Sequence, residues 1–164
     1  MPDSIDIAPF KDIFRTHPAG VAIITLQGNG QPAGFTATSV ISVSASPPVI
    51  VFSVQGSSSN LAALEQSDSV VIHFLDQRHE GLAVRFATPG IDRFEHSNWQ
   101  ALPSGEPLLT DVATWMRCRV INRTPAGSSM LFQVCPQSAK VELDRAPIIY
   151  HDRLFHGVGA LPPG

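Results

Sequence analysis

Two hydroxyl-rich stretches are the segments best suited to binding chemistry. The first is Gly34-Phe35-Thr36-Ala37-Thr38-Ser39, and the second is Ser53-Val54-Gln55-Gly56-Ser57-Ser58-Ser59-Asn60. Between Thr36 and Asn60 the chain has ten Ser or Thr residues and no charged side chain. Hydroxyls and the free N–H groups of a helix that begins after a Gly/Ser loop can hold a phosphate without any Lys or Arg. A purely structural alternative, a hydroxyl-rich strand face followed by a helix cap, explains the same residues.

Other kinds of site find little support in the residue spacing. The six histidines form no His-x-x-x-His or His-Glu-x-x-His pattern, and there is no Gly-x-Ser-x-Gly elbow, so neither a metal site nor a serine hydrolase is expected. Gly28, Gly30 and Gly34 miss the spacing of a dinucleotide-binding loop and precede a strand, which favours a hairpin turn. His151 and His156 lie five apart in an extended segment, which predicts opposite faces. We assign no catalytic side chain.

The distribution of charge is the main compositional feature. From Thr16 to Leu64 the chain has no Asp, Glu, Lys or Arg, and charged residues make up 15% of the whole, against about 25% in an ordinary soluble domain. This block is rich in Val, Ile and Thr, so we expect it to be folded, and either buried or covered by a partner. A phosphate held there would need a cation from outside the block, and Arg15, Arg78 and Arg85 are the first candidates.

Length, net charge and cysteine content limit the number of domains, the kinds of partner and the cellular location that we expect. The chain has 164 residues, which suits a single domain over 1–164 with flexible ends at 1–7 and 158–164. A net charge of −3 gives no electrostatic case for binding nucleic acid or an anionic membrane, and no apolar run is long enough to cross one. The acidic start lacks a signal-peptide pattern, and the two cysteines form no disulfide framework, so a cytoplasmic protein is expected. Cys118, between two arginines in a strand-like run, is expected to be a buried, inert thiol.

Short strands joined by tight turns must position these side chains. The stretches with strand composition are 21–26, 33–43, 49–54, 69–75, 114–122, 130–135, 140–143, 148–150 and 153–156. The stretches with helical spacing or helix-forming residues are 8–17, 57–67 and 76–86, where Ser57 or Ser58 would cap the second. This pattern favours antiparallel pairing in a mainly β protein and a closed or half-closed barrel.

Several short motifs follow one another in an order that is specific when taken together. They are Phe14-Arg15-Thr16-His17-Pro18-Ala19-Gly20-Val21, the stretch 34–40, Ser42-Val43-Ser44, the run 47–53, the stretch 57–64, Phe86, Gly105-Glu106-Pro107-Leu108 and the run 147–155. From about Phe10 to Gly157 this ordered set resembles the flavin reductase-like, FMN-binding split-barrel family. That family includes the small reductase components of two-component flavin monooxygenases.

The resemblance implies a six-stranded Greek-key split β-barrel with a few short helices, forming a homodimer with FMN, or FAD, near the subunit interface. It also implies hydride transfer from NADH or NADPH to the flavin, where the cofactor carries out the chemistry. The cofactor-binding residues that it implies are Gly34, Phe35, Thr36, Ala37, Thr38 and Ser39 along the ring and ribityl chain, Ser53, Val54 and Gln55 at the ring edge, Ser59 and Asn60 at the phosphate, and Phe86 beside the cofactor.

One departure from the family pattern concerns the nicotinamide. The family's reductases usually carry Gly-Asp-His in a turn where this chain reads Gly127-Ser128-Ser129, so His151 or Arg153 would have to compensate. The leading hypothesis is an NAD(P)H:flavin reductase that delivers reduced flavin to a partner monooxygenase. The alternatives are a flavin-binding electron carrier of the same fold without nicotinamide-dependent activity, and a barrel that dimerises and binds no flavin.

Overall fold

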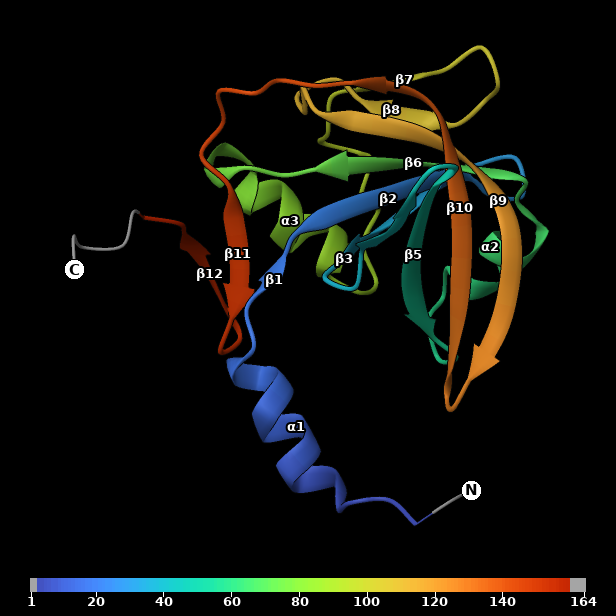
Figure 1. Ribbon diagram of the computed structural model, residues 1–164. Helices are drawn as coiled ribbons and strands as arrows, with labels where there is room; N and C mark the ends of the chain where they lie inside the picture. The colour runs from blue at the N-terminus through green and yellow to red at the C-terminus, as the bar shows by residue number, and fades with distance from the viewer. Residues whose placement is uncertain (1–2, 160–164) are drawn as a thin grey trace.

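The largest sheet has seven strands that pair in an order different from their order in the chain. The computed structural model describes residues 3–159 (Figure 1). In order of pairing the strands are β3 (Pro32–Ala37), β2 (Ala22–Gln27), β6 (Ser69–Phe74), β9 (Trp115–Ala126), β10 (Ser129–Lys140), β5 (Pro48–Gln55) and β4 (Ile41–Ala45). Every neighbouring pair is antiparallel, as the tight turns predict.

The connection between its two edges makes this sheet curl into a half-closed barrel. Strands β3 and β4 are the opposite edges, yet only residues 38–40 separate them in the chain. Four extended steps cover at most about 14 Å, so the two edges must approach each other. The mainly β architecture is confirmed. The prediction of one strand over 33–43 is wrong, because the chain crosses the split there, and the sheet has seven strands rather than six.

Two hydrophobic clusters bury side chains on both faces of β2. Ala22, Ile24 and Leu26 lie in the cluster inside the barrel, whereas Ile23 packs in a second cluster with Phe86 of α3 (Glu80–Ala87). Five successive residues of β2 are buried, because alternate side chains enter alternate clusters. A strand buried on both faces has no place for a charged side chain, which accounts for part of the charge-free block.

Smaller elements surround the barrel in residues 3–159. Strands β1 (Ala19–Gly20), β11 (Ile148–His151) and β12 (Leu154–Gly157) form a three-stranded sheet, and β7 (Trp99–Ala101) pairs with β8 (Pro107–Leu109). The other helices are α1 (Ile7–Thr16), α2 (Leu61–Gln66) and the short 3-10 helix η1 (Gln77–His79).

The structure corrects several of the helix and strand boundaries that the sequence predicts. The helix over 8–17 is confirmed. The helix over 57–67 is too long, since α2 begins after the Gly/Ser loop with Asn60 at its cap. The Asn60 side chain makes no capping hydrogen bond, and the Ser58 hydroxyl accepts the backbone N–H of Asn60 at 3.2 Å. The helix over 76–86 is divided, because Asp76 caps η1 before α3 starts. The strand over 140–143 is wrong: β10 continues to Lys140, where the chain leaves the sheet.

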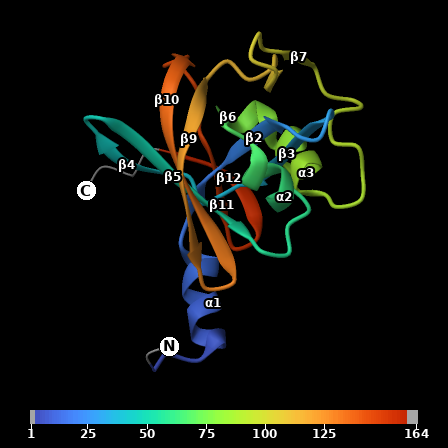
Figure 2. The same ribbon diagram turned by 90° about the vertical axis from the view of Figure 1, so that its right-hand side faces the viewer.

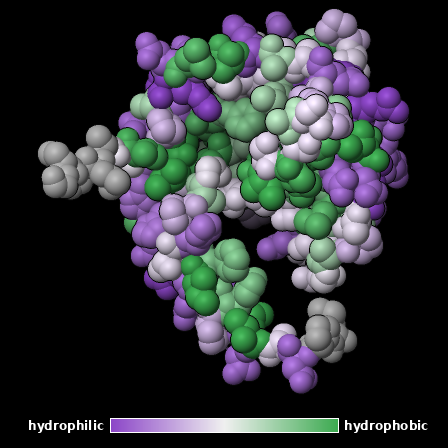
Figure 3. All heavy atoms as spheres, in the orientation of Figure 1, coloured by the Kyte–Doolittle hydropathy of each residue, from purple (hydrophilic) through white to green (hydrophobic). Residues whose placement is uncertain are grey.

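Helix α1 projects from the barrel and leaves its apolar face uncovered. Both ribbon views show it standing away from the sheet (Figures 1 and 2), and apolar side chains gather along it in the space-filling view (Figure 3). Phe10, Ile13 and Phe14 are 50%, 60% and 58% exposed. Its last turn is tied to the β11–β12 turn, where the Arg15 Nε–H donates to Asp152 Oδ1 at 2.5 Å and the Asp152 N–H donates to the Arg15 carbonyl at 2.8 Å.

Two sequence predictions concern the flexible ends and the absence of a membrane-spanning segment. Residues 1, 2 and 160–164, which belong to the predicted flexible ends, lie outside the described residues, and Ile7 is the first residue of α1. Within residues 3–159, every helix is too short or too polar to serve as a bilayer-spanning segment.

Candidate functional site

The two hydroxyl-rich stretches come together around one cavity of about 660 Å³, which we call the hydroxyl cavity. Its lining residues are Phe35, Thr36, Thr38, Ser39, Ser53, Val54, Gln55, Ser57, Ser58, Ser59, Asn60, Phe86, Ala87, Pro89 and Arg93. Ten of the twelve residues implied for a cofactor are therefore neighbours in space, although they come from β3, β5, the following loop and α3. The first stretch reaches the cavity where the chain crosses the barrel split.

Gly34 and Ala37 are the two implied residues that do not line this cavity. Ala37 is buried in the barrel cluster, because it alternates with Thr36 along β3. Gly34 faces Phe86: a Cβ atom there would lie 3.0 Å from a ring carbon of Phe86 and 3.0 Å from the Ile24 carbonyl oxygen. Gly34 thus allows the close contact between β3 and α3 that places Phe86 at the cavity.

Two of the hydroxyls serve the fold. The Thr36 hydroxyl donates to the carbonyl of Ala83 in α3 at 2.6 Å. The Ser39 hydroxyl accepts the Ser53 N–H at 3.0 Å and donates to the Ser53 carbonyl at 3.2 Å, which joins the crossing segment to β5. These bonds hold the walls of the cavity in place, and both residues still line it.

The side chain of Asn60 indicates where a ligand would bind. Asn60 is 8% exposed, and among the described residues neither its amide nor the Ser59 hydroxyl has a protein hydrogen-bond partner. The Asn60 residue is mostly buried, but its amide atoms remain accessible at the cavity, where they are free to bind a polar ligand. Helix α2, with six residues, is too short to add much of a helix dipole to this site.

Arg93 is the residue at this cavity that the sequence pattern does not reveal. It follows α3 in an irregular loop, lines the hydroxyl cavity as Asn60 does, and is half-buried. Its Nη1–H donates to the Gly34 carbonyl at 2.7 Å and its Nε–H to the Thr88 carbonyl at 3.1 Å. Burial lowers the pKa of Arg93 from its ordinary value, but a guanidinium remains charged at neutral pH. One cation therefore faces the charge-free block. In the sequence, Arg93 is a single arginine in an irregular stretch, and no motif there marks it as a site residue.

The three cations expected from the sequence lie elsewhere. None of them lines the hydroxyl cavity. Arg78 donates to Asp76 at 2.6 Å and Arg15 is bound to Asp152, so nearby carboxylates hold both of them. Arg85 is on the last turn of α3. The sequence does not show that Arg15 has an acidic neighbour, because Asp152 is far from it along the chain.

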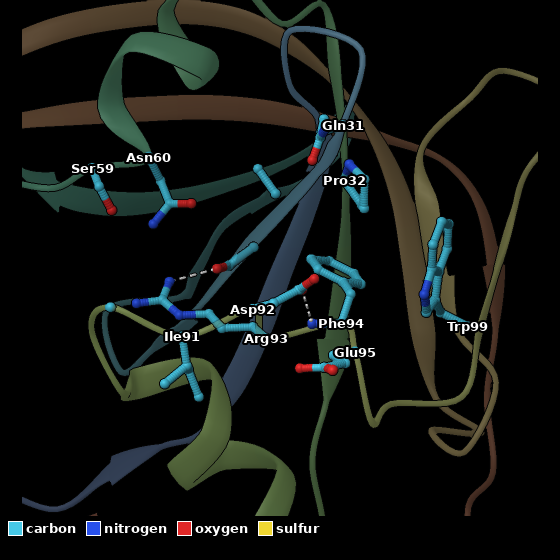
Figure 4. A pocket seen from close by; sticks show the side chains of 13 residues that line it. Gln31, Pro32, Ser59, Asn60, Ile91, Asp92, Arg93, Phe94, Glu95 and Trp99 are labelled. Atoms are coloured by element: carbon cyan, nitrogen blue, oxygen red, sulfur yellow. Dashed lines mark hydrogen bonds between the residues drawn. The ribbon is translucent and has the colours of Figure 1, made fainter.

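A second cavity of about 660 Å³ adjoins the first, and we call it the Trp99 cavity. Its lining residues are Gln31, Pro32, Ala33, Gly34, Ser59, Asn60, Gly90, Ile91, Asp92, Arg93, Phe94, Glu95 and Trp99. Figure 4 shows Ser59, Asn60 and Arg93 on one side of it and Trp99 on the other. The two cavities share Ser59, Asn60 and Arg93, so these three residues form the junction between them.

The two nicotinamide candidates are placed differently. Arg153 lines a cavity of about 430 Å³ beside Thr38. It also borders a larger space of about 990 Å³ between α1 and the barrel. His151 is next to His156 instead, with ring centroids 5.6 Å apart. The prediction that these two histidines lie on opposite faces is wrong, because the chain reverses between them in the β11–β12 hairpin.

The Gly127-Ser128-Ser129 turn between β9 and β10 lies beside the hydroxyl cavity. The Ser128 carbonyl accepts the Gly56 N–H at 2.9 Å, and Gly56 belongs to the loop between β5 and α2. A Cβ atom at Gly56 would meet the same carbonyl oxygen at 2.9 Å. This part of the site therefore presents backbone and small hydroxyls, without an ionisable side chain.

The arrangement can bind but offers no catalytic acid or base. Arg93 is the single ionisable residue that lines the hydroxyl cavity in the described part of the chain. No group of three or more His, Cys, Asp or Glu side chains within residues 3–159 could hold a metal ion. The cavity combines an aromatic ring, many hydroxyls and one cation, which suits a flat polar ring joined to a phosphate.

The chain is similar to flavin reductases in both sequence and fold. A family model described as flavin reductase like domain matches residues 14–159. The NADH:FMN oxidoreductase of Rhodococcus qingshengii is 38% identical over 152 residues, which cover 90% of this chain and 79% of that protein. The FMN reductase (NADH) RutF of Methylorubrum extorquens is 31% identical over 160 residues, covering 96% and 78%. The crystal structure of a flavin reductase domain protein from Arthrobacter sp. FB24 has a TM-score of 0.90 at 37% identity, covering 95% of this chain and 98% of that one.

Proposed function

The chain belongs to the flavin reductase-like family, and from this we propose that it is an NADH-dependent flavin reductase that uses FMN in the hydroxyl cavity. The gathering of ten implied residues around one cavity carries this proposal. It is supported by the curated relatives named NADH:FMN oxidoreductase and FMN reductase (NADH). Because the site has no acid or base, a reaction in which the cofactor accepts the hydride suits it.

The residues present fit FMN. At the junction, the Asn60 amide, the Ser59 hydroxyl and the Arg93 guanidinium would hold the phosphate, and a charge-assisted hydrogen bond from Arg93 would be the strongest of these contacts. Thr38, Ser53 and Gln55 would bind the ring and ribityl chain, with Phe86 alongside. The role of these side chains is to orient the ring and to exclude water from one of its faces.

Arg153 would bind the nicotinamide dinucleotide. It lines the cavity of about 430 Å³ beside Thr38. A cation from elsewhere in the chain is needed because this chain reads Gly127-Ser128-Ser129 where the family usually carries Gly-Asp-His. Arg153 has a φ of 64°, a left-handed conformation that costs a non-glycine residue about 1–2 kcal/mol. Arg153→Gly should therefore relieve the turn and keep the fold, while removing the cation. An increase in the KM for NADH with no loss of thermal stability is the expected result, and an unchanged KM would exclude this role.

We also propose that two copies pair through α1 and that reduced flavin passes to a monooxygenase. The apolar side chains of Phe10, Ile13 and Phe14 are exposed on a projecting helix, and single proteins rarely leave such a face uncovered. A second copy would cover it and close the space of about 990 Å³ beside the hydroxyl cavity. Cys118 and Cys135 are free thiols, which fits a cytoplasmic location.

Anaerobic mixing of the FMN-loaded protein with NADH tests the proposed activity. Bleaching of the flavin absorbance is expected in the wild type. Arg93→Ala should weaken FMN binding about 10- to 100-fold, whereas Arg85→Ala, on the last turn of α3, is the matched control and should leave it unchanged. Flavin that binds but is not bleached by NADH or NADPH would favour the electron carrier, the alternative suggested by the Gly127-Ser128-Ser129 turn. Protein that binds no flavin would refute both.

A further inference from the structure

The Trp99 cavity continues from the point where the flavin phosphate would bind. Ser59, Asn60 and Arg93 line both cavities, which are each about 660 Å³. If the phosphate lies at this junction, a group esterified to it would extend into the Trp99 cavity. FMN ends at its phosphate and would leave this second cavity to solvent.

A tryptophan forms the far wall of this cavity. Trp99 is 39% exposed, so part of its indole is open to solvent. Its position is held by edge contacts, since the Phe94 ring lies 5.5 Å from the Trp99 ring at 74° and 5.1 Å from the Phe86 ring at 81°. The indole is thus a fixed, partly open aromatic surface, on which a purine base can stack.

The charged groups between the junction and Trp99 are carboxylates. Asp92 and Glu95 line the cavity (Figure 4). One Asp92 oxygen accepts the Phe94 N–H at 2.9 Å, which orients this side chain. Among the described residues that line the cavity, Arg93 is the only cation, and it is at the junction. Carboxylates repel a phosphate placed beside them but accept hydrogen bonds from ribose hydroxyls. A diphosphate would therefore have to stay at the junction with Arg93, which leaves the ribose to face the carboxylates.

We propose that the Trp99 cavity binds the adenosine half of FAD, an assignment that rests on the proposed flavin reductase function. The diphosphate would lie at the junction near Arg93, the ribose hydroxyls near Asp92 and Glu95, and the adenine against Trp99. The chain would then bind FAD more tightly than FMN, by about tenfold if the stacked base contributes about 1.4 kcal/mol, which lies in the lower half of its usual range. NADH also carries adenosine, but its diphosphate has no reason to occupy the junction when a flavin phosphate is there.

Equilibrium titration of the apoprotein with FMN and with FAD, monitored by flavin fluorescence anisotropy, tests this assignment. Trp99→Ala should weaken FAD binding about tenfold and change FMN binding less than twofold, while Trp99→Phe retains most of the FAD affinity. Ile121→Ala, on an exposed position of β9, is the control and should change neither.

Four outcomes would overturn the assignment. Equal losses for FMN and FAD in Trp99→Ala would mean that Trp99 only supports the fold. No loss for FAD would mean that the adenine lies elsewhere. A wild type that binds FMN but not FAD would refute the adenosine site and leave the proposed reductase function intact. A higher KM for NADH with unchanged FAD affinity would assign the cavity to the nicotinamide dinucleotide. Binding of neither flavin, in contrast, would refute the proposed function itself.

Discussion

His73 should make the stability of this protein depend strongly on pH between neutral and about 4. Its imidazole is completely buried between β2 and β8. The Nδ1–H donates to the Ile23 carbonyl at 3.1 Å, and Nε2 accepts the Leu109 N–H at 3.0 Å. Protonation of Nε2 would place two N–H groups against each other in a buried site. Desolvation by burial is the main cause that lowers the pKa of His73 to about 4 from an ordinary 6.5, and the hydrogen bond to Ile23 opposes it.

The magnitude follows from proton linkage. The lowered pKa means that the folded protein keeps His73 neutral while the unfolded chain takes up a proton below about 6.5. Stability that is fully present above pH 6.5 is therefore lost as the pH falls toward 4, by about 1.4 kcal/mol per pH unit and about 3 kcal/mol in all. Glu106 does not contribute above about pH 4.5. Although burial raises its pKa, hydrogen bonds from Ser104, Ser69 and Arg117 lower it to about 2, so its effect appears only below about pH 4.5.

Urea unfolding of the flavin-free protein at several pH values between 7 and 4.5 measures this slope. His73→Asn, which keeps a donor and an acceptor on a side chain that does not titrate, should unfold with a much weaker pH dependence than the wild type over this range. Equal slopes in the two proteins would refute the argument. If the variant does not fold, an NMR titration of the wild-type imidazole still decides the matter, since a midpoint at or above 6.5 is incompatible with the burial described.

Three further predictions concern other buried side chains or close contacts. Gly34→Ala should destabilise the fold by about 1–3 kcal/mol, because the new methyl group meets Phe86 at 3.0 Å; Gly81→Ala, with nothing within 4 Å, should be neutral or stabilising in thermal melts. Glu106→Gln should lower the free energy of unfolding at pH 7 by about 2 kcal/mol. The difference from the wild type shrinks as the pH falls from about 4.5 toward 2, because the unfolded wild-type chain takes up a proton on this carboxylate while the folded protein keeps it ionised. The Cys118 thiol, whose pKa is raised to about 12 by burial, should react with a disulfide reagent only after unfolding, and fast labelling of the native protein would contradict this.

The irregular segment after α3 gains a role from the proposed adenosine site. Residues 91–106 have no clear helix or strand pattern in the sequence, and the structure forms the short strand β7 within them, at Trp99–Ala101. In the structure this segment supplies the single cation of the hydroxyl cavity, Arg93, and the aromatic wall of the adjoining one, Trp99. Both are held by contacts to distant elements: Arg93 to the carbonyl of Gly34, and Trp99 through Phe94 to α3.

Local features of this protein can be predicted from its sequence alone. The spacing of Phe10, Ile13 and Phe14 predicts α1, the β-branched run before Gly28 predicts β2, and the two hydroxyl-rich stretches contain nearly all of the implied site. These features can be recognised in the sequence because helix and strand periodicity, turn residues and short motifs each depend on only a few neighbouring residues.

How these pieces meet depends on the three-dimensional fold. In the folded chain the backbone crosses the barrel split between β3 and β4, carboxylates hold Arg15 and Arg78 while Arg93 enters the site, and His151 turns toward His156. The reason is physical: closure of the sheet and the pairing of charges depend on contacts between residues far apart in the chain. Such contacts leave no periodic pattern in the sequence, because many orders of the same strands would bury the same apolar faces.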